Sequence, residues 1–175
     1  MKLILLIFTL LTKSPGQIIS DKYYYGSYIS DNKLICACED TSYLTLEFDL
    51  ETDELNSKRI SKKFFYDILK KAKSKTECTD VKKVVASFYN IDPEYLTISS
   101  CVEIKDFHIS IAYFENEIEE SKSFIVIHND ESIVMQLLHK HIIDIKNTDN
   151  MLLIIFEEKN GFTISKILID DIDSY

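Results

Sequence analysis

Alternating hydrophobic and polar positions run through most of the chain and predict a series of half-buried strands. The cleanest alternation spans residues 43–50, where Leu44, Leu46 and Phe48 share one face and polar residues take the other. Similar patterns predict strands at residues 23–29, 34–38, 95–102, 107–114 and 124–128. Near the end, Asn160-Gly161 separates two apolar runs, residues 151–158 and 162–169, and predicts a hairpin.

The period changes to a helical one in residues 61–90. Ser61 is placed to cap a first amphipathic helix, and Asp92-Pro93 ends the segment after a second. We expect these helices to pack on the sheet through six apolar residues: Phe64, Phe65, Ile68, Val84, Val85 and Phe88. Asn129 or Asp130 is placed to cap a third helix, which would carry Ile133, Val134, Leu137 and Leu138.

Taken together, these elements predict an α+β fold: a mostly antiparallel β-sheet with two or three packed amphipathic helices. No stretch rich in glycine, serine or proline interrupts the pattern after the first sixteen residues. We therefore expect residues 17–175 to form a single globular domain.

The first sixteen residues have the pattern of a secretory signal peptide. Lys2 precedes an apolar run from residue 3 to residue 11, and Ser14-Pro15-Gly16 follows it with small residues suited to cleavage before Gln17. The apolar run is too short to favour a membrane span, which needs about twenty residues. We expect a secreted, extracellular protein without stable membrane insertion.

Four cysteines fit an exported chain: Cys36, Cys38, Cys78 and Cys101. On a strand, Cys36 and Cys38 share one face with α-carbons ~6.5–7 Å apart, too far for easy bonding to each other. We therefore expect each of the two to bond separately, one to Cys78 and the other to Cys101, with the connectivity between them open.

Composition argues against catalysis and against nucleic-acid binding. The net charge is −9, there are three glycines, and Arg59 is the single arginine. No glycine-rich phosphate loop, nucleophile elbow or zinc motif occurs. His139-Lys140-His141, with Asp144 nearby, is an incomplete ligand set for a metal. We predict no catalytic, cofactor or metal site, and no nucleic-acid partner, because the lysines do not gather on one aromatic-rich face.

The candidate binding residues are four tyrosines near the expected mature N-terminus: Tyr23, Tyr24, Tyr25 and Tyr28. Tyrosine is well suited to recognition surfaces, although strand alternation should bury about half of the four. Gly26-Ser27-Tyr28 also resembles the G-x-W opening of the lipocalins, with Tyr28 in place of the tryptophan. The helical segment 61–90 departs from that family, which has consecutive strands there.

Two functions follow from these patterns. The first is a secreted, disulfide-bonded, non-enzymatic protein that acts by binding an extracellular protein partner, as an effector or modulator. The second, implied by the lipocalin resemblance, is a carrier that encloses a small hydrophobic ligand in an eight-stranded barrel.

Overall fold

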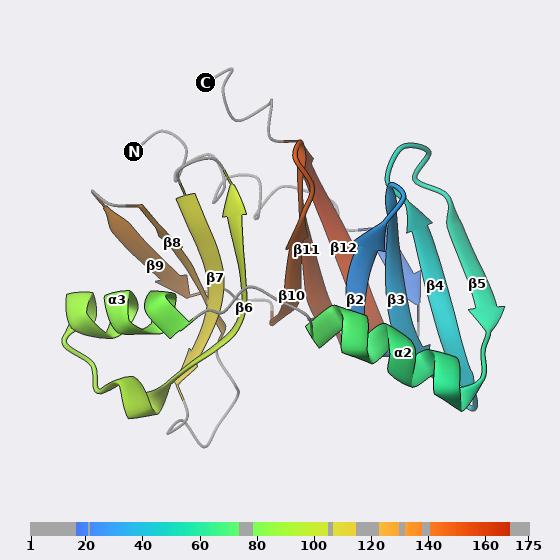
Figure 1. The fold of residues 1–175 in the computed structure, drawn as a ribbon, viewed down its shortest axis with the longest axis horizontal. Helices are drawn as coiled ribbons and strands as arrows, with labels where there is room; N and C mark the ends of the chain where they lie inside the picture. Colours follow the sequence, from blue (N-terminus) through green and yellow to red (C-terminus); the bar gives the residue numbers. More distant parts are fainter. Residues whose placement is uncertain are drawn as a thin grey trace. The chain divides into compact units, whose positions relative to one another are not determined.

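The computed structural model describes residues 17–20, 22–73, 79–104, 107–114, 123–129, 132–137 and 141–168. Twelve strands in these ranges form three four-stranded sheets (Figure 1). The chain divides into two compact units: an N-terminal unit of Ile18–Lys75 with Glu158–Thr163, and a C-terminal unit built on Thr76–Glu157 with Ile164–Tyr175. The expected signal peptide lies outside the described residues.

The N-terminal unit is a meander of four antiparallel strands with one helix. Its strands, in spatial order, are β2 (Tyr23–Ser30), β3 (Lys33–Glu39), β4 (Tyr43–Asp49) and β5 (Leu55–Arg59). Asp31 and Asn32 both have positive φ angles, as a tight two-residue hairpin loop requires. The helix α2 (Lys62–Lys73) covers one face of the sheet. Ser61 caps it as predicted, because its Oγ accepts a 3.2 Å hydrogen bond from the Phe64 amide.

One extra residue in β2 changes which face of the sheet the later residues of this strand point to. Tyr24 is opposite Cys38, but Gly26 is opposite Ala37, so Tyr25 is the additional residue of a β-bulge. The bulge lets α2 approach closely at Gly26, where an added Cβ would lie 3.1 Å from the Cβ of Ala72. A side chain here would require α2 to shift by a few tenths of an ångström, and the φ of 157° at Gly26 is one that other residues rarely adopt.

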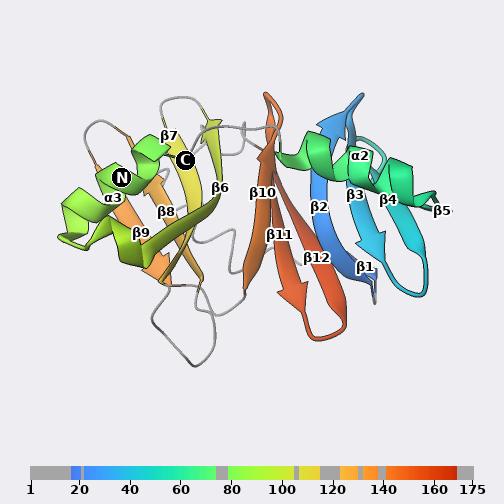
Figure 2. The same ribbon diagram turned by 60° about the horizontal axis from the view of Figure 1, so that its bottom comes forward.

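The C-terminal unit contains a second antiparallel meander. Its strands are β6 (Leu96–Ile104), β7 (Phe107–Phe114), β8 (Ser123–His128) and β9 (Ile133–Leu137). The helix α3 (Thr79–Tyr89) lies against one face (Figure 2), where Val81 and Val85 meet Ala112 and Val126. Asp92 caps a short 3₁₀ turn, η1 (Pro93–Tyr95), through the Glu94 amide.

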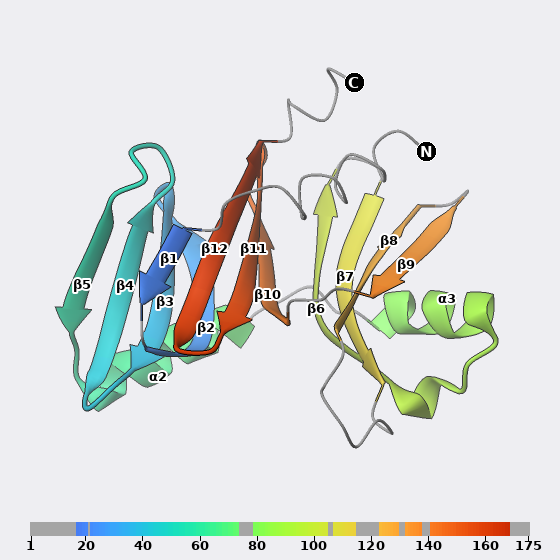
Figure 3. The same ribbon diagram turned by 180° about the vertical axis from the view of Figure 1, so that it is seen from behind.

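The third sheet has the order β1-β12-β11-β10, with β1 beside β12 (Figure 3). Its strands are β1 (Gln17–Ser20), β10 (Ile142–Asn147), β11 (Met151–Glu158) and β12 (Gly161–Leu168). The predicted Asn160-Gly161 hairpin joins β11 to β12. Isoleucine side chains of β7 and β8 pack against those of β10 and β11 and form the largest apolar core of the C-terminal unit.

The predicted fold class is wrong in its helical content. The chain is mainly antiparallel β-sheet in three sheets, with two α-helices in its described part, rather than an α+β fold with two or three helices on one sheet. The expected third helix is the strand β9, where Ile133 and Met135 face α3 and Val134 faces the opposite core. β-Branched residues lose less side-chain freedom in a strand than in a helix, so this apolar run pairs with β8.

The predicted packing faces of the helices are correct in part. Phe65, Ile68 and Val85 are buried, but Phe64, Val84 and Phe88 are exposed. In α3 the inward stripe is shifted around the helix from the predicted one and contains Val81, Val85, Ala86 and Tyr89. Val84 and Phe88 lie about 100° around the helix from Val85 and Tyr89, on the side away from Ala86, which explains their exposure.

The neighbouring residues Phe64 and Phe65 provide a matched test of this packing. Phe65 is 3% exposed and Phe64 is 49% exposed. Phe65→Ala should lower the free energy of unfolding by about 3–5 kcal/mol, since it removes a buried ring. Phe64→Ala should change it by no more than about 0.5 kcal/mol. Urea denaturation followed by circular dichroism measures both, and equal losses would contradict the described orientation of α2.

Candidate binding surface

The bulge in β2 decides which of the four predicted tyrosines face α2. Tyr23 precedes the bulge and Tyr25 is the bulged residue. Both lie on the α2 face, and Tyr28 returns to the same face after the bulge. Tyr24 lies on the opposite face, where its ring contacts Phe162 at 5.2 Å and its hydroxyl donates a 2.8 Å hydrogen bond to Ser27 Oγ. Tyr28 is half-buried and packs against the core under α2. Tyr23 and Tyr25 are therefore the two tyrosines of the four that are presented to solvent, with 75% and 51% of their surface exposed.

An aromatic patch forms around the buried ring of Phe65. The Phe65 centroid lies 5.4 Å from that of Tyr25, 4.6 Å from that of Tyr43 and 5.8 Å from that of Tyr66. Two of the three contacts are edge-to-face, the arrangement that ring quadrupoles favour. We use the name aromatic patch for five residues: Tyr23, Tyr25, Tyr43, Phe65 and Tyr66.

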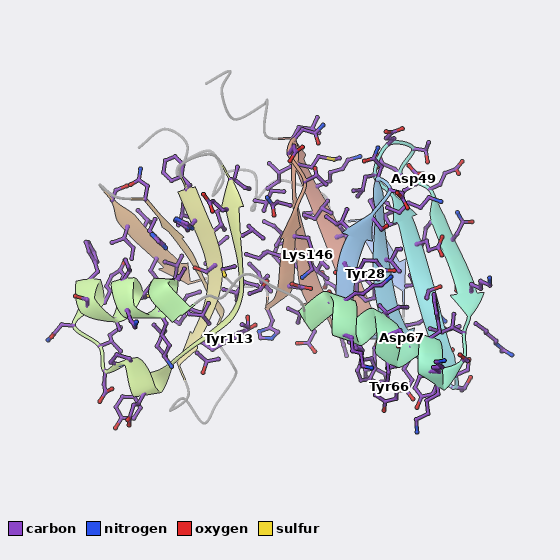
Figure 4. The ribbon with its side chains drawn as sticks, in the orientation of Figure 1. Tyr28, Asp49, Tyr66, Asp67, Tyr113 and Lys146 are labelled. Atoms are coloured by element: carbon purple, nitrogen blue, oxygen red, sulfur yellow. The ribbon has the colours of Figure 1, made fainter. Side chains whose placement is uncertain are left out.

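Sequence reasoning missed the contribution of α2 to this patch. Tyr66 is 48% exposed, and Figure 4 shows it projecting from α2 on the side opposite to Tyr28. The available signal was the run Phe64-Phe65-Tyr66. Three successive helical residues point in directions about 100° apart, so a helix that packs by one face cannot bury all of them.

Glu39 orients Tyr25, one of the exposed tyrosines of the aromatic patch. It lies directly opposite Tyr23 on β2 and Tyr43 on β4. The Tyr25 hydroxyl donates a hydrogen bond to its carboxylate, which raises the pKa of Tyr25 above the ordinary value; partial burial and the negative charge of Glu39 act in the same direction. The hydrogen bond to Glu39 thus holds the Tyr25 hydroxyl in a defined orientation.

Lysines lie beside these rings. The Lys62 ammonium is 6.0 Å from the centroid of Tyr66, and the Lys71 ammonium is 4.8 Å from that of Tyr28. The sequence of α2 contains five lysines and one acidic residue, Asp67, in a chain of net charge −9. Lys62 and Lys71 contact different rings, so the expectation that the lysines do not gather on one aromatic-rich face stays a prediction.

The predicted bridges from Cys36 and Cys38 are absent from the structure. Both residues are buried on β3 and neither forms a disulfide. The reason is their place in a central strand: Cys36 lies between Ser27 and Leu46, and Cys38 lies between Tyr24 and Leu44. Cys101, half-buried on β6, is disulfide-bonded. Cys78, the remaining cysteine of the chain, lies outside the described residues.

His141 and Asp144, the described members of the candidate metal-ligand set, have separate partners. His141 Nε2 is 3.8 Å from Glu157 Oε2, whereas the buried Asp144 accepts hydrogen bonds from Ser100 Oγ at 3.0 Å and from Lys146 Nζ at 2.8 Å. Ser100 belongs to β6, so this polar cluster links β6 to β10 and has a structural role. His139 lies outside the described residues, and the part of the chain that the structure describes has no group of three or more metal-ligating side chains.

Comparisons with protein-family models, with curated proteins and with solved structures find no match to this chain. Among the described residues, no helix combines the length and the apolar content that crossing a membrane would require. Function must therefore be inferred from the surface itself.

The state of Cys38 can be tested by its reactivity. Burial raises the pKa of the Cys38 thiol to about 12, so it remains protonated and a poor nucleophile at pH 8. In native protein, iodoacetamide at pH 8 should leave Cys38 unmodified, and in urea it should alkylate it fully, as peptide mass spectrometry would show. A disulfide-linked peptide that contains Cys38, or rapid alkylation without denaturant, would contradict this arrangement.

Proposed function

We propose that this protein is a secreted, non-enzymatic binding protein that uses the aromatic patch to hold an extracellular protein partner. The observation that carries the proposal is the presence of two exposed tyrosines, Tyr25 and Tyr66, against the buried ring of Phe65, with a third exposed tyrosine, Tyr23, near Tyr25. Exposed aromatic side chains of this kind provide most of the binding energy at many protein interfaces.

The patch is ordered before any partner binds. Tyr25 and Tyr66 rest against a ring that is itself locked in the core, and Glu39 holds the Tyr25 hydroxyl. Association costs free energy for every side chain that it immobilises, and tyrosine loses little because it has two side-chain torsions. Preorganisation of this type favours binding through the rate of dissociation.

The charge around the patch suggests the chemistry of its partner. Lys62 lies against Tyr66, a ring of the aromatic patch, with its ammonium 6.0 Å from the ring centroid. Cations at the rim of an apolar patch accelerate encounter with acidic surfaces and disfavour basic ones. We expect the partner to present apolar side chains flanked by Asp or Glu.

The structure gives little support to the carrier of a small hydrophobic ligand. That reading depended on a lipocalin-like barrel of eight strands, but the twelve described strands form three separate sheets of four. The largest core cluster of the C-terminal unit is filled by fully buried side chains, including Ile109, Ile125 and Ile154. A core filled by side chains in this way stabilises the fold and leaves no room for a bound ligand among these residues.

Secretion is supported by the leader-like pattern of residues 1–16 and by the disulfide at Cys101. Protein disulfides persist in extracellular compartments and are rare where thiols are kept reduced. Both observations agree with a partner that is met outside the cell.

Alanine substitution separates the patch from the rest of the surface. Tyr23→Ala, Tyr25→Ala and Tyr66→Ala combined should weaken capture of the partner from extracellular fluid by at least about a hundredfold, since each anchor contributes more than about 1 kcal/mol. Tyr95→Ala is the matched control, because Tyr95 has a similarly exposed ring in the C-terminal unit.

Affinity capture with quantitative mass spectrometry measures the effect, and thermal denaturation checks that both variants remain folded. Loss of capture in the Tyr95 variant, or unchanged capture in the triple variant, would place the interface elsewhere.

A further inference from the structure

β5 is an open edge of the N-terminal sheet. It pairs with β4 on one side, and all five of its residues are exposed. Figure 1 shows it as the outermost strand beyond β4. An edge strand presents a row of backbone hydrogen-bonding groups that can pair with another strand.

The direction of these groups follows from the hydrogen bonds at the two ends of β5. The Asp49 amide donates to the Glu54 carbonyl at 2.9 Å, and the Ile60 amide donates to the Tyr43 carbonyl at 3.0 Å. In an antiparallel pair, alternate residues bond to the same neighbour, so even-numbered residues face β4. The N–H and C=O groups of Leu55, Ser57 and Arg59 therefore point outward, and among the described residues no hydrogen bond engages them.

The edge strand β9 of the other meander differs from β5, because a side chain bonds to one of its outward backbone groups. On β9 the Asn129 amide donates to the Ser132 carbonyl, so by the same alternation the Met135 amide points away from β8. The hydroxyl of Tyr89 from α3 accepts a 3.0 Å hydrogen bond from this amide. On β9 a side chain therefore accepts a hydrogen bond from an outward-facing amide. In the described part of the chain, no side chain does the same for β5.

We propose that β5 pairs with β5 of a second copy of this chain, antiparallel and centred on Asn56, so that two four-stranded sheets become one of eight strands. In this register Leu55 bonds with Ser57 of the second copy, and the outward groups of both strands are used. The two-fold axis makes the contact closed, so the product is a dimer and not a fibre.

The charges on β5 favour both this pairing register and a second copy of the chain as the partner. Centring on Asn56 places Glu54 directly opposite Lys58 of the second copy, on the same face of the sheet, and symmetry makes this pair twice. Centring on Ser57 would instead place Glu54 opposite Ile60 and Lys58 opposite Asn56, with no ion pair. A lysine on an edge normally discourages strand pairing, but here a second copy of the same strand brings the carboxylate that compensates it.

Charge reversal tests this pairing in the full chain. Lys58→Glu places two carboxylates opposite each other at both positions, and Glu54→Lys does the same with two ammonium groups. Each variant should dimerise at least about tenfold more weakly than the natural chain in sedimentation equilibrium at low salt. A mixture of the two variants should form a heterodimer, because the two carboxylates on β5 of the first variant then lie opposite the two ammonium groups on β5 of the second.

Two further variants separate the effect of charge on β5 from the effect of backbone pairing. Lys63→Glu makes the same charge change on the exposed surface of α2 and should leave dimerisation unchanged. Ser57→Pro removes an outward N–H group without touching a hydrogen bond to β4, and should abolish the dimer. A monomer at all concentrations would overturn the proposal. So would a dimer that is insensitive to both charge reversals, or variants that fail to associate when mixed.

Discussion

The burial of Phe65 between α2 and the β2–β5 sheet is the contact on which the proposed binding surface depends. The ring closes a small core with Ala37 and Ile68, and it also supports Tyr25, Tyr43 and Tyr66. One residue therefore contributes both to the stability of the N-terminal unit and to the order of its exposed aromatic side chains. A patch built on a core ring is stiffer than one built on a loop, and this stiffness reduces the entropic cost of binding.

The bulge at Tyr25 shows which part of the side-chain alternation in β2 can be predicted from sequence. Alternation correctly predicts that the four tyrosines divide between two faces, but a regular strand would place Tyr28 with Tyr24. The inserted residue restores Tyr28 to the α2 face, and Gly26 beside it admits the helix. A bulge depends on the register of two paired strands, so the pattern of β2 alone could not reveal it.

Other differences between expectation and structure also arise from tertiary pairing. The Asn160-Gly161 hairpin and the Ser61 cap are local signals, and both are confirmed. β4 is a strand as predicted, but its polar face is not solvated, because Thr45 is buried on the side that α2 covers. By contrast, β5 is polar and becomes a strand because it pairs with β4, and β9 has an apolar run that suits either a helix or a strand. The burial of Cys36 and Cys38 likewise reflects neighbours on β2 and β4 that spacing along the chain does not specify.

The central claim is that a partner lies against the aromatic patch, and site-specific photo-crosslinking tests it most directly. A benzophenone side chain at position 66 lies among the exposed rings, and the same group at position 95 lies on the C-terminal unit. After irradiation in extracellular fluid, the first should give one dominant covalent adduct with the partner, and the second should give none. An adduct at position 95 alone, or equal adducts at both positions, would contradict the assignment of the patch as the binding surface.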